Sequence, residues 1–271
     1  MLKSLVIISA LISAMIFSSV SYASSLEVIA LKDVNGKSET SLLIGASESE
    51  VSKYFPDGKM PSQILAFLVR VGEQEILFDT GLSDGHISNE ILKNNSKPEN
   101  IKIILLTHLH MDHFGGLLTP EGEITFPNAE VYVSKIEYDY WVKDIKNESV
   151  IKTLKAYESK LHFFDFNDEV VSCVKAIDTS GHTPGHTSYL IDSGDEKLLI
   201  VGDVVHFMDI QLPNPEISVR YDVDPVKAAE SRKFIFDYAA ENNIRVAGMH
   251  MTFPSVYSLK KSVKGYEKFT R

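Results

Sequence analysis

The sequence predicts an α/β fold, built from short buried strands separated by amphipathic helices. Three observations support this prediction. Runs of apolar and β-branched residues, bounded by turn residues, recur along the chain. Segments with helical periodicity interrupt these runs, and His or Asp directly follows several of them. Two packed sheets flanked by helices suit this order, although the pattern alone leaves other α/β arrangements open.

Residues 1–23 have the organisation of a secretory signal peptide. Lys3 gives the start a positive charge, residues 5–17 are apolar, and Ser21-Tyr22-Ala23 is a small-x-small cleavage site. Serines behind the apolar run keep it shorter than the roughly 20 residues of a transmembrane helix. We expect cleavage, a periplasmic or secreted protein without stable membrane association, and a single domain over residues 24–271.

The strand candidates are apolar runs with turn residues on either side. From the amino terminus onward they are residues 25–30, 64–71, 75–78, 103–106, 130–133, 187–191, 198–201 and 245–247. Three helices are also predicted. Ser134 and Glu137 form a capping box that opens a helix through Trp141. An amphipathic segment spans residues 150–157, and a helix with one apolar face spans residues 224–243.

One short segment has the composition of a metal site. His108, His110, Asp112 and His113 follow the predicted strand 103–106, and a glycine pair then breaks regular structure. On extended chain His108 and His110 point the same way, whereas Asp112 and His113 lie beyond the bend. The segment therefore predicts ligands for two metals at a strand-to-loop edge that is open to solvent.

Three further ligand candidates stand in similar places. His186 closes a turn rich in glycine and proline, Asp203 follows strand 198–201, and His250 follows the apolar residues around strand 245–247. A sheet scaffold brings together ligands from distant parts of a sequence in this way. Each residue alone is weak evidence, and their joint spacing carries the prediction.

This ordered set of motifs, with Phe78-Asp79-Thr80-Gly81 before it, resembles the metallo-β-lactamase superfamily. The resemblance implies a four-layer αββα sandwich of two mixed sheets with outer helices. It implies that His108, His110 and His186 hold one metal. Asp112, His113 and His250 would hold the other, with Asp203 as the bridge. For the remaining histidines, His86, His162, His182 and His206, we expect places on the surface or behind the ligands.

Other motifs resemble one branch of the superfamily, which contains methyl parathion hydrolase and N-acyl homoserine lactone hydrolases. They are Phe126 to Ala129, the Tyr140-Trp141 pair, Gly202 through Asp222-Val223-Asp224, Phe253-Pro254 and Lys264 to Tyr266. The true metallo-β-lactamases lack the bridging aspartate, so Asp203 argues against β-lactam hydrolysis.

The ligand set predicts hydrolysis by two divalent metal ions that share Asp203 and a hydroxide with a pKa near 7. Zinc is the expected metal, and Fe, Mn or Co also suits imidazole and carboxylate ligands. The expected substrate is a neutral lactone or ester. An organophosphate triester is an alternative, as is a non-hydrolytic or di-iron member of the fold.

Two residues are candidates for proton transfer. Asp112 is expected to carry a proton to the leaving group through the carboxylate oxygen that does not bind metal. His206 stands three residues after Asp203, where the resembled lactonases carry a tyrosine. It is predicted to donate to the substrate oxygen or to shuttle a proton, and the alternative is a histidine without function.

The walls of the cleft decide which substrate fits. Aromatic and apolar candidates are Tyr140, Trp141, Phe207 and Met208, with packing in the core as the alternative. A net charge of −10 excludes the usual nucleic-acid binders, so the expected partner is a small neutral or apolar molecule. A homodimer is compatible with the resemblance.

Overall fold

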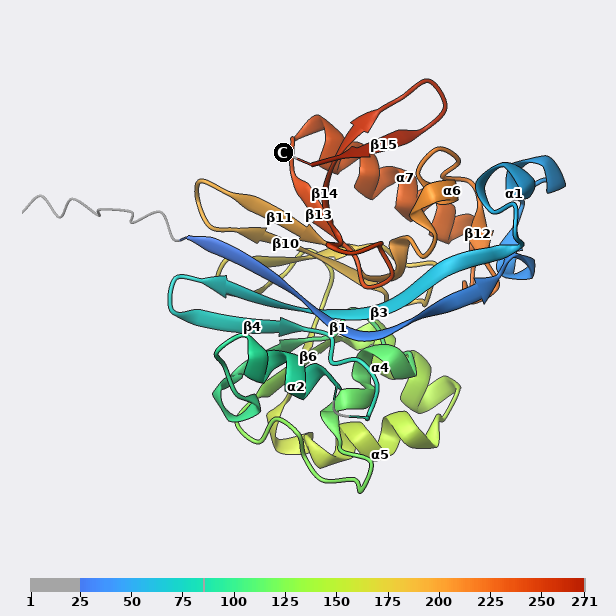
Figure 1. Ribbon diagram of the computed structural model, residues 1–271. Helices are drawn as coiled ribbons and strands as arrows, with labels where there is room; N and C mark the ends of the chain where they lie inside the picture. Colours follow the sequence, from blue (N-terminus) through green and yellow to red (C-terminus); the bar gives the residue numbers. More distant parts are fainter. Residues whose placement is uncertain (1–24, 85, 271) are drawn as a thin grey trace, which may run out of the picture.

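Two β-sheets pack face to face between two outer layers of helices, which confirms the predicted four-layer α/β sandwich (Figure 1). This computed structural model describes residues 25–84 and 86–270, so the predicted signal peptide lies outside the described residues. Within that part of the chain, no helix combines the length and the apolar character needed to cross a bilayer.

The first sheet contains six strands. In spatial order they are β1 (Leu26–Glu39), β3 (Lys59–Val71), β4 (Gln74–Phe78), β5 (Ile103–Leu105), β6 (Glu130–Ser134) and β7 (Leu161–Phe164). The sheet is mixed, because β1, β3 and β4 are antiparallel neighbours whereas β4 to β7 pair in parallel. The carboxyl ends of the parallel strands lie at one edge of the sheet, where the histidine-rich segment follows β5.

The second sheet contains seven strands. In spatial order they are β15 (Tyr266–Phe269), β14 (Val256–Lys261), β13 (Arg245–Ala247), β11 (Lys197–Ile200), β10 (Thr187–Asp192), β9 (Val174–Asp178) and β8 (Glu169–Val171). Only β11 and β13 pair in parallel, so this sheet is mixed as well. Asp203 and His250 follow these two parallel strands and therefore reach the same edge of the sheet.

Strand β3 shows how the core divides between the layers. Leu65, Phe67 and Val69 pack against residues of the second sheet, whereas Ala66 and Leu68 join the cluster under the helices. Side chains alternate between the two faces of a strand, so one strand serves both interfaces. Residues 65–69 are all apolar because neither face of the strand meets water there.

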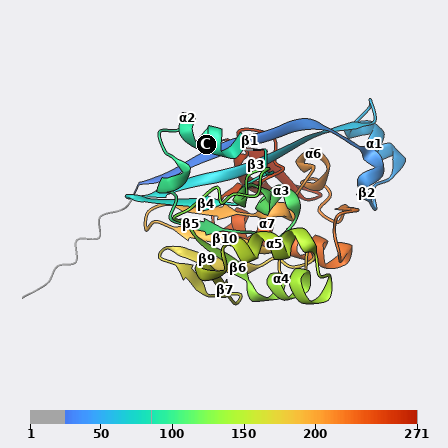
Figure 2. The same ribbon diagram turned by 90° about the horizontal axis from the view of Figure 1, so that it is seen from below.

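Helices cover both outer faces (Figures 1 and 2). The outer helices are α2 (His86–Lys93), α4 (Lys135–Asp139) and α5 (Glu148–Ala156) on the first sheet and α7 (Pro225–Glu241) on the second. Asp224 caps α7, since its side chain accepts hydrogen bonds from the backbone N–H groups of Val226 and Lys227. Helix α4 continues into a π-helical turn, Tyr140–Asp144.

The long hairpin of β1 and β3 extends beyond the sandwich and carries α1 (Glu48–Tyr54) at its end (Figure 2). Strand β2 (Leu43–Ile44) in this arm pairs with β12 (Ser218–Val219). A small cluster around Phe55, Met60 and Phe207 packs beneath it. The arm therefore forms one side of the edge where the ligands meet.

The sequence missed several elements. Residues 32–39 are too polar to indicate a strand, yet β1 continues to Glu39 because β3 pairs with it along this length. Strands β7, β8, β9, β14 and β15 were not predicted, nor were α1 and α2. One of the two bonds of the predicted capping box is present, since the Ser134 side chain accepts from Glu137 N. The Glu137 carboxylate instead accepts from Leu109 N.

Candidate metal centre

The ligand candidates come from four strand ends at one edge of the two sheets. The loop after β5 carries the histidine-rich segment, and the turn before β10 carries His182 and His186. Asp203 follows β11 and His250 follows β13. Most of these side chains are buried: His108 and His113 are fully enclosed, whereas His110 and Asp112 are half-buried. The expectation of a solvent-open edge is therefore wrong for the inner ligands.

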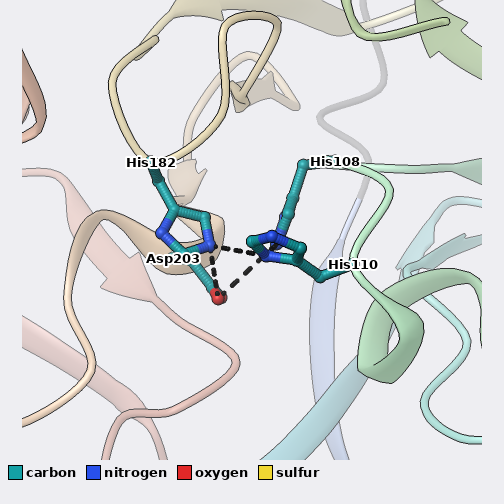
Figure 3. A group of neighbouring side chains, drawn as sticks. All are labelled: His108, His110, His182 and Asp203. Carbon is teal, nitrogen blue, oxygen red and sulfur yellow. Dashed lines mark hydrogen bonds and ion pairs between the residues drawn. The ribbon is translucent and has the colours of Figure 1, made fainter. Parts of the chain in front are cut away.

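One group of donors consists of three imidazoles and a carboxylate, His108, His110, His182 and Asp203 (Figure 3). His110 Nδ1 lies 3.0 Å from His108 Nε2 and 2.9 Å from His182 Nε2. Asp203 Oδ2 lies 3.3 Å from His182 Nε2. Their ring nitrogens converge on one point, as the ligands of a single cation do.

The second group consists of Asp112, His113 and His250. Asp203 Oδ1 lies 3.3 Å from His113 Nε2, and Asp112 Oδ2 lies 3.4 Å from His250 Nε2. Asp203 thus faces both groups: its Oδ1 lies near His113, whereas its Oδ2 lies near His182 and, at 3.1 Å, near His250. This is the arrangement expected of a carboxylate that bridges two cations.

His182, not His186, completes the first group, which corrects the assignment from sequence. His186 Nε2 accepts a hydrogen bond from Asp203 N at 2.9 Å, and His186 Nδ1 donates to the carbonyl of Thr179. Both ring nitrogens of His186 are therefore used inside the protein. Gly202 makes room for this ring, because a Cβ there would lie 2.6 Å from His186 Nε2.

The donor atoms fit two divalent cations. His113 Nε2 and Asp203 Oδ1 are buried without a hydrogen-bond partner, and such atoms are rare unless a ligand satisfies them. Burial lowers the pKa of His110 to about 3 and that of His108 well below its usual value. Burial alone would raise the pKa of Asp203, but the imidazoles around it, His113 foremost, hold it well below its usual range. Neutral imidazoles and ionised carboxylates are the forms that bind metal. Burial also lowers the pKa of His113, His182 and His250, but the carboxylates around them outweigh burial and raise each pKa above its usual value, so a cation would displace a proton from these three rings.

Further side chains orient the ligands from behind. Asp79 Oδ2 accepts from His113 Nδ1 at 2.7 Å, and Asp222 Oδ1 accepts from His182 Nδ1 at 2.8 Å. The carbonyl of Gln63 accepts from His250 Nδ1 at 2.6 Å. These bonds direct the other ring nitrogen of each histidine toward the cation site. The sequence contained Asp79 and Asp222 within its motifs but did not indicate this role.

A cavity of about 400 Å³ opens over the two groups. His110, Asp112, His182, Asp203, His206 and His250 line its polar floor. Its other walls come from Ser38, Ser62, Ile64, Met111, Phe207 and Tyr221. The sequence missed Tyr221 and the three residues of the β1–β3 arm, which have no local signal.

Of the four predicted wall residues, only Phe207 lines this cavity. Met208 is buried in the core beside α7. Trp141 donates to Glu137 and packs edge-on against His110, with ring centroids 5.4 Å apart, and Tyr140 packs edge-on against Trp141. These three side chains do not reach the cavity, because packing against the helices and the ligand loop holds them outside.

His206 lies next to the carboxylate of Asp203. Its Nε2 is 3.1 Å from Asp203 Oδ2, its ring stacks on His250 with centroids 4.9 Å apart, and its Nδ1 is buried without a partner. His86 and His162 are exposed, as predicted. His206 and Asp112 both border the cavity, so each can contact a bound molecule.

Comparison with known families agrees with this geometry. Residues 60–241 match the family model described as the metallo-beta-lactamase superfamily. The chain belongs to this superfamily. The matched region runs from β3 through the end of α7, so it includes every residue of the two donor groups except His250, which lies just beyond it.

Members of the superfamily that resemble the chain include two lactonases. An N-acyl homoserine lactonase of a Bacillus species is 27% identical over 155 residues, which cover 48% of this chain and 58% of the relative. Another, from Bacillus cereus, is 25% identical over 173 residues, which cover 54% of this chain and 65% of the relative. The chain thus spans less than two thirds of the length of these curated relatives.

Two solved structures of the superfamily match over most of the chain. AidC, described as a dizinc quorum-quenching lactonase in complex with a product, N-hexanoyl-L-homoserine, has a TM-score of 0.83 and 28% identity, over 91% of this chain and 94% of AidC. AbOPH, described as a hydrolase in the beta lactamase superfamily, has a TM-score of 0.80 and 29% identity, over 90% of this chain and 93% of that one.

Within this superfamily fold, Glu137 joins the two histidine-bearing loops. One carboxylate oxygen accepts from Leu109 N at 2.9 Å and from Trp141 Nε1 at 2.6 Å. The other accepts from Thr183 Oγ1 at 2.7 Å and from Gly185 N at 3.0 Å. Leu109 lies between His108 and His110, and Thr183 follows His182, so this buried carboxylate holds both loops in register.

A Glu137→Gln variant is expected to be less stable than the parent. The amide NH₂ group cannot accept hydrogen bonds, so two donors lose their acceptor, at about 1–3 kcal/mol for each buried group left unpaired. Urea unfolding measures the loss. Glu121→Gln, a change at an exposed glutamate, is the control. Equal midpoints for the two variants would contradict the role assigned to Glu137.

Proposed function

We propose that this protein is a dinuclear metal-dependent hydrolase of the lactonase type, acting on a neutral lactone or ester. The observation that carries the proposal is the pair of donor groups, joined by Asp203, on the floor of a cavity of about 400 Å³. Zinc is the proposed metal, because five imidazoles and two carboxylates suit it and because AidC is described as dizinc.

The two cations would be held by His108, His110 and His182 on one side and by Asp112, His113 and His250 on the other, with Asp203 between them. When bound, such ions polarise a carbonyl or phosphoryl oxygen and supply an activated water as nucleophile. The two donor groups consist of histidines and aspartates alone, so the protein's own part is to bind, orient and move protons.

Asp112 is the proposed proton carrier. Burial would raise its pKa, but the histidines beside it keep that pKa low, so its ionised carboxylate would accept a proton from the attacking water and pass that proton to the leaving group. Its Oδ2 faces His113 and His250, at 3.6 and 3.4 Å from their Nε2 atoms, which leaves Oδ1 for the substrate side of the cavity. His206 is proposed to donate from its ring to the oxygen on which negative charge develops. Its place beside Asp203, at the cavity wall, supports this role.

The cavity walls support a neutral substrate. Ile64, Met111, Phe207 and Tyr221 offer apolar and aromatic surface. Among the described residues that line the cavity, none is Lys or Arg, so nothing there would pair with a phosphate monoester or a free carboxylate except the cations. An N-acyl homoserine lactone is a neutral molecule of this kind, and the similar lactonases take their name from it.

Metal analysis coupled to a hydrolysis screen tests the proposal. The screen contains aryl and alkyl lactones, acyl-homoserine lactones, phosphate triesters and a chromogenic β-lactam. We expect two metal ions per chain and turnover of lactones above the other classes. Dominant triester turnover would move the substrate to the organophosphate alternative. A coloured, redox-active preparation would indicate di-iron chemistry, and a chain without metal would contradict the proposal.

Removing the metals is expected to lower the melting temperature. Ions that bind only the folded protein add about 2.7 kcal/mol per site when their free concentration is 100 times the dissociation constant. Differential scanning calorimetry before and after dialysis against a chelator measures the change. Restoring zinc should restore the melting temperature, whereas Mg²⁺, which prefers oxygen ligands, should not. An unchanged melting temperature would argue against two sites.

Export is proposed from the first residues alone. A signal peptide over residues 1–23 would place the enzyme in the periplasm or outside the cell. Amino-terminal sequencing of protein from the native compartment should begin at Ser24. Recovery of chains that begin at Met1 from the cytoplasm would contradict this proposal.

A further inference from the structure

Arg232, in the middle of α7, is a fully buried cation behind the metal centre. Its guanidinium donates to three backbone carbonyls, those of Val204 at 2.6 Å, Pro215 at 2.8 Å and Ile217 at 2.9 Å. A buried charge is costly unless its donors are bonded in this way. The contacts join segments that are distant in sequence, so they are candidates for holding those segments in place.

One of these segments adjoins a proposed metal ligand, and the other leads to a carboxylate that bonds to one. Val204 follows the bridging Asp203 directly, so its carbonyl belongs to the turn that presents that carboxylate. The other two carbonyls lie just before β12, and the chain after β12 reaches Asp222. Asp222 in turn accepts a hydrogen bond from His182 Nδ1 at 2.8 Å.

Arg232 also faces Asp222 itself. Its Nη2 lies 3.9 Å from Asp222 Oδ2 and has no hydrogen-bond partner. That oxygen accepts from Val219 N at 3.0 Å, while Oδ1 of the same carboxylate binds His182. Arg232, Asp222 and His182 thus form a buried row that ends at the first donor group.

We propose that Arg232 is a positioning residue for the metal centre, which holds His182 through Asp222 and Asp203 through the turn at Val204. The inference rests on the metal centre of the proposed function. Stability alone is a weak reason for a buried guanidinium, because a packed apolar side chain often replaces a buried ion pair without loss of stability. The two routes from one guanidinium to two ligands are the reason to assign it to the site.

Because of this row, replacing Arg232 should weaken metal binding unequally at the two donor groups. His182 belongs only to the group of His108 and His110, and none of the contacts of Arg232 reaches Asp112, His113 or His250. Loss of a partner behind a ligand weakens metal binding by about 10- to 100-fold. We therefore expect the cation at the His182 side to bind that much more weakly. The other cation should be weakened less, because Asp203 is the one donor of its site that the contacts of Arg232 reach.

Zinc titration by calorimetry tests the inference. It is done on two separate metal-free variants, Arg232→Met and Arg232→Lys. Lysine keeps the charge but cannot bond three carbonyls and face Asp222 at once. Lys233→Met is the matched control, because it removes the next cation on the same helix, one that is 40% exposed and paired with Glu216. Asp222→Asn tests the row without touching α7.

The expected result in both Arg232 variants is zinc binding that is weakened strongly on the His182 side and less on the other side. Asp222→Asn should weaken only the His182 side, and Lys233→Met should leave both sites unchanged. In the Arg232→Met, Asp222→Asn double variant the losses should be less than additive, since both changes disturb the same ligand. Two unchanged sites in Arg232→Lys, equal weakening of both sites, or fully additive losses would overturn the inference. If the parent protein binds no zinc, the metal centre itself fails, which is a different result.

Discussion

An Asp203→Asn variant is expected to lose nearly all hydrolytic activity and to bind metal poorly. Changes behind metal ligands cost about 10- to 100-fold, and Asp203 is shared by both donor groups, so we expect a loss of more than about 100-fold in kcat/KM. Asparagine keeps the size of the side chain and the hydrogen bond from the backbone N–H to His186 Nε2. It removes the negative charge and one acceptor oxygen, which are what two cations require.

The measurement is the initial rate on the best lactone of the screen, together with elemental analysis of the same sample. Asp209→Asn is the control, because Asp209 is a half-exposed aspartate on the adjoining helix α6 (Met208–Gln211) that forms an ion pair with Lys268. Activity of Asp203→Asn within tenfold of this control would show that Asp203 does not bridge two metals.

The second large effect is expected from the pair His182→Ala and His186→Ala. The first variant should bind one metal rather than two and lose most activity, because His182 Nε2 is one of three imidazole donors of its group. The second should keep two metals. It removes the hydrogen-bond acceptor of Asp203 N, which should lower the free energy of unfolding by about 1–3 kcal/mol.

Elemental analysis and urea unfolding of both variants separate the two roles. The pair forms its own control, since both changes remove a buried imidazole from the same turn. Two metals in His182→Ala with one in His186→Ala would restore the assignment made from the sequence. That outcome would also show that the contacts of His186 with Asp203 and Thr179 give way when metal is present.

The local pattern was sufficient where a residue's place follows from its own segment. His108, His110, Asp112 and His113 lie in one run after β5, so any fold that buries this strand brings them to one edge. Asp203 and His250 were predicted from their joint spacing rather than from one segment, and each follows one of the two parallel strands of the second sheet. Helix α7 was predicted because its cap and its apolar face are both local features.

The pattern was insufficient where the direction of a side chain depends on a distant partner. His182 and His186 share one turn and the same neighbours in sequence. The backbone of Thr187 bonds to Thr107, which fixes the start of β10 and turns His186 toward the main chain of Asp203. Trp141 was expected at the cleft, but the carboxylate of Glu137, itself buried between two loops, holds its indole away.

The sequence by itself therefore determined the α/β class, the kinds of ligand and the strand ends that carry them, because periodicity and strand-to-loop order are properties of single segments. The tertiary structure alone decided which imidazole of the turn faces the cation site, which walls enclose the cavity, and which buried charges stand behind the ligands. Those features arise where segments distant in the chain come together, as Ser38 and Ser62 of the β1–β3 arm line the same cavity as Tyr221. Their contacts depend on the packing of whole layers, and no local pattern records them.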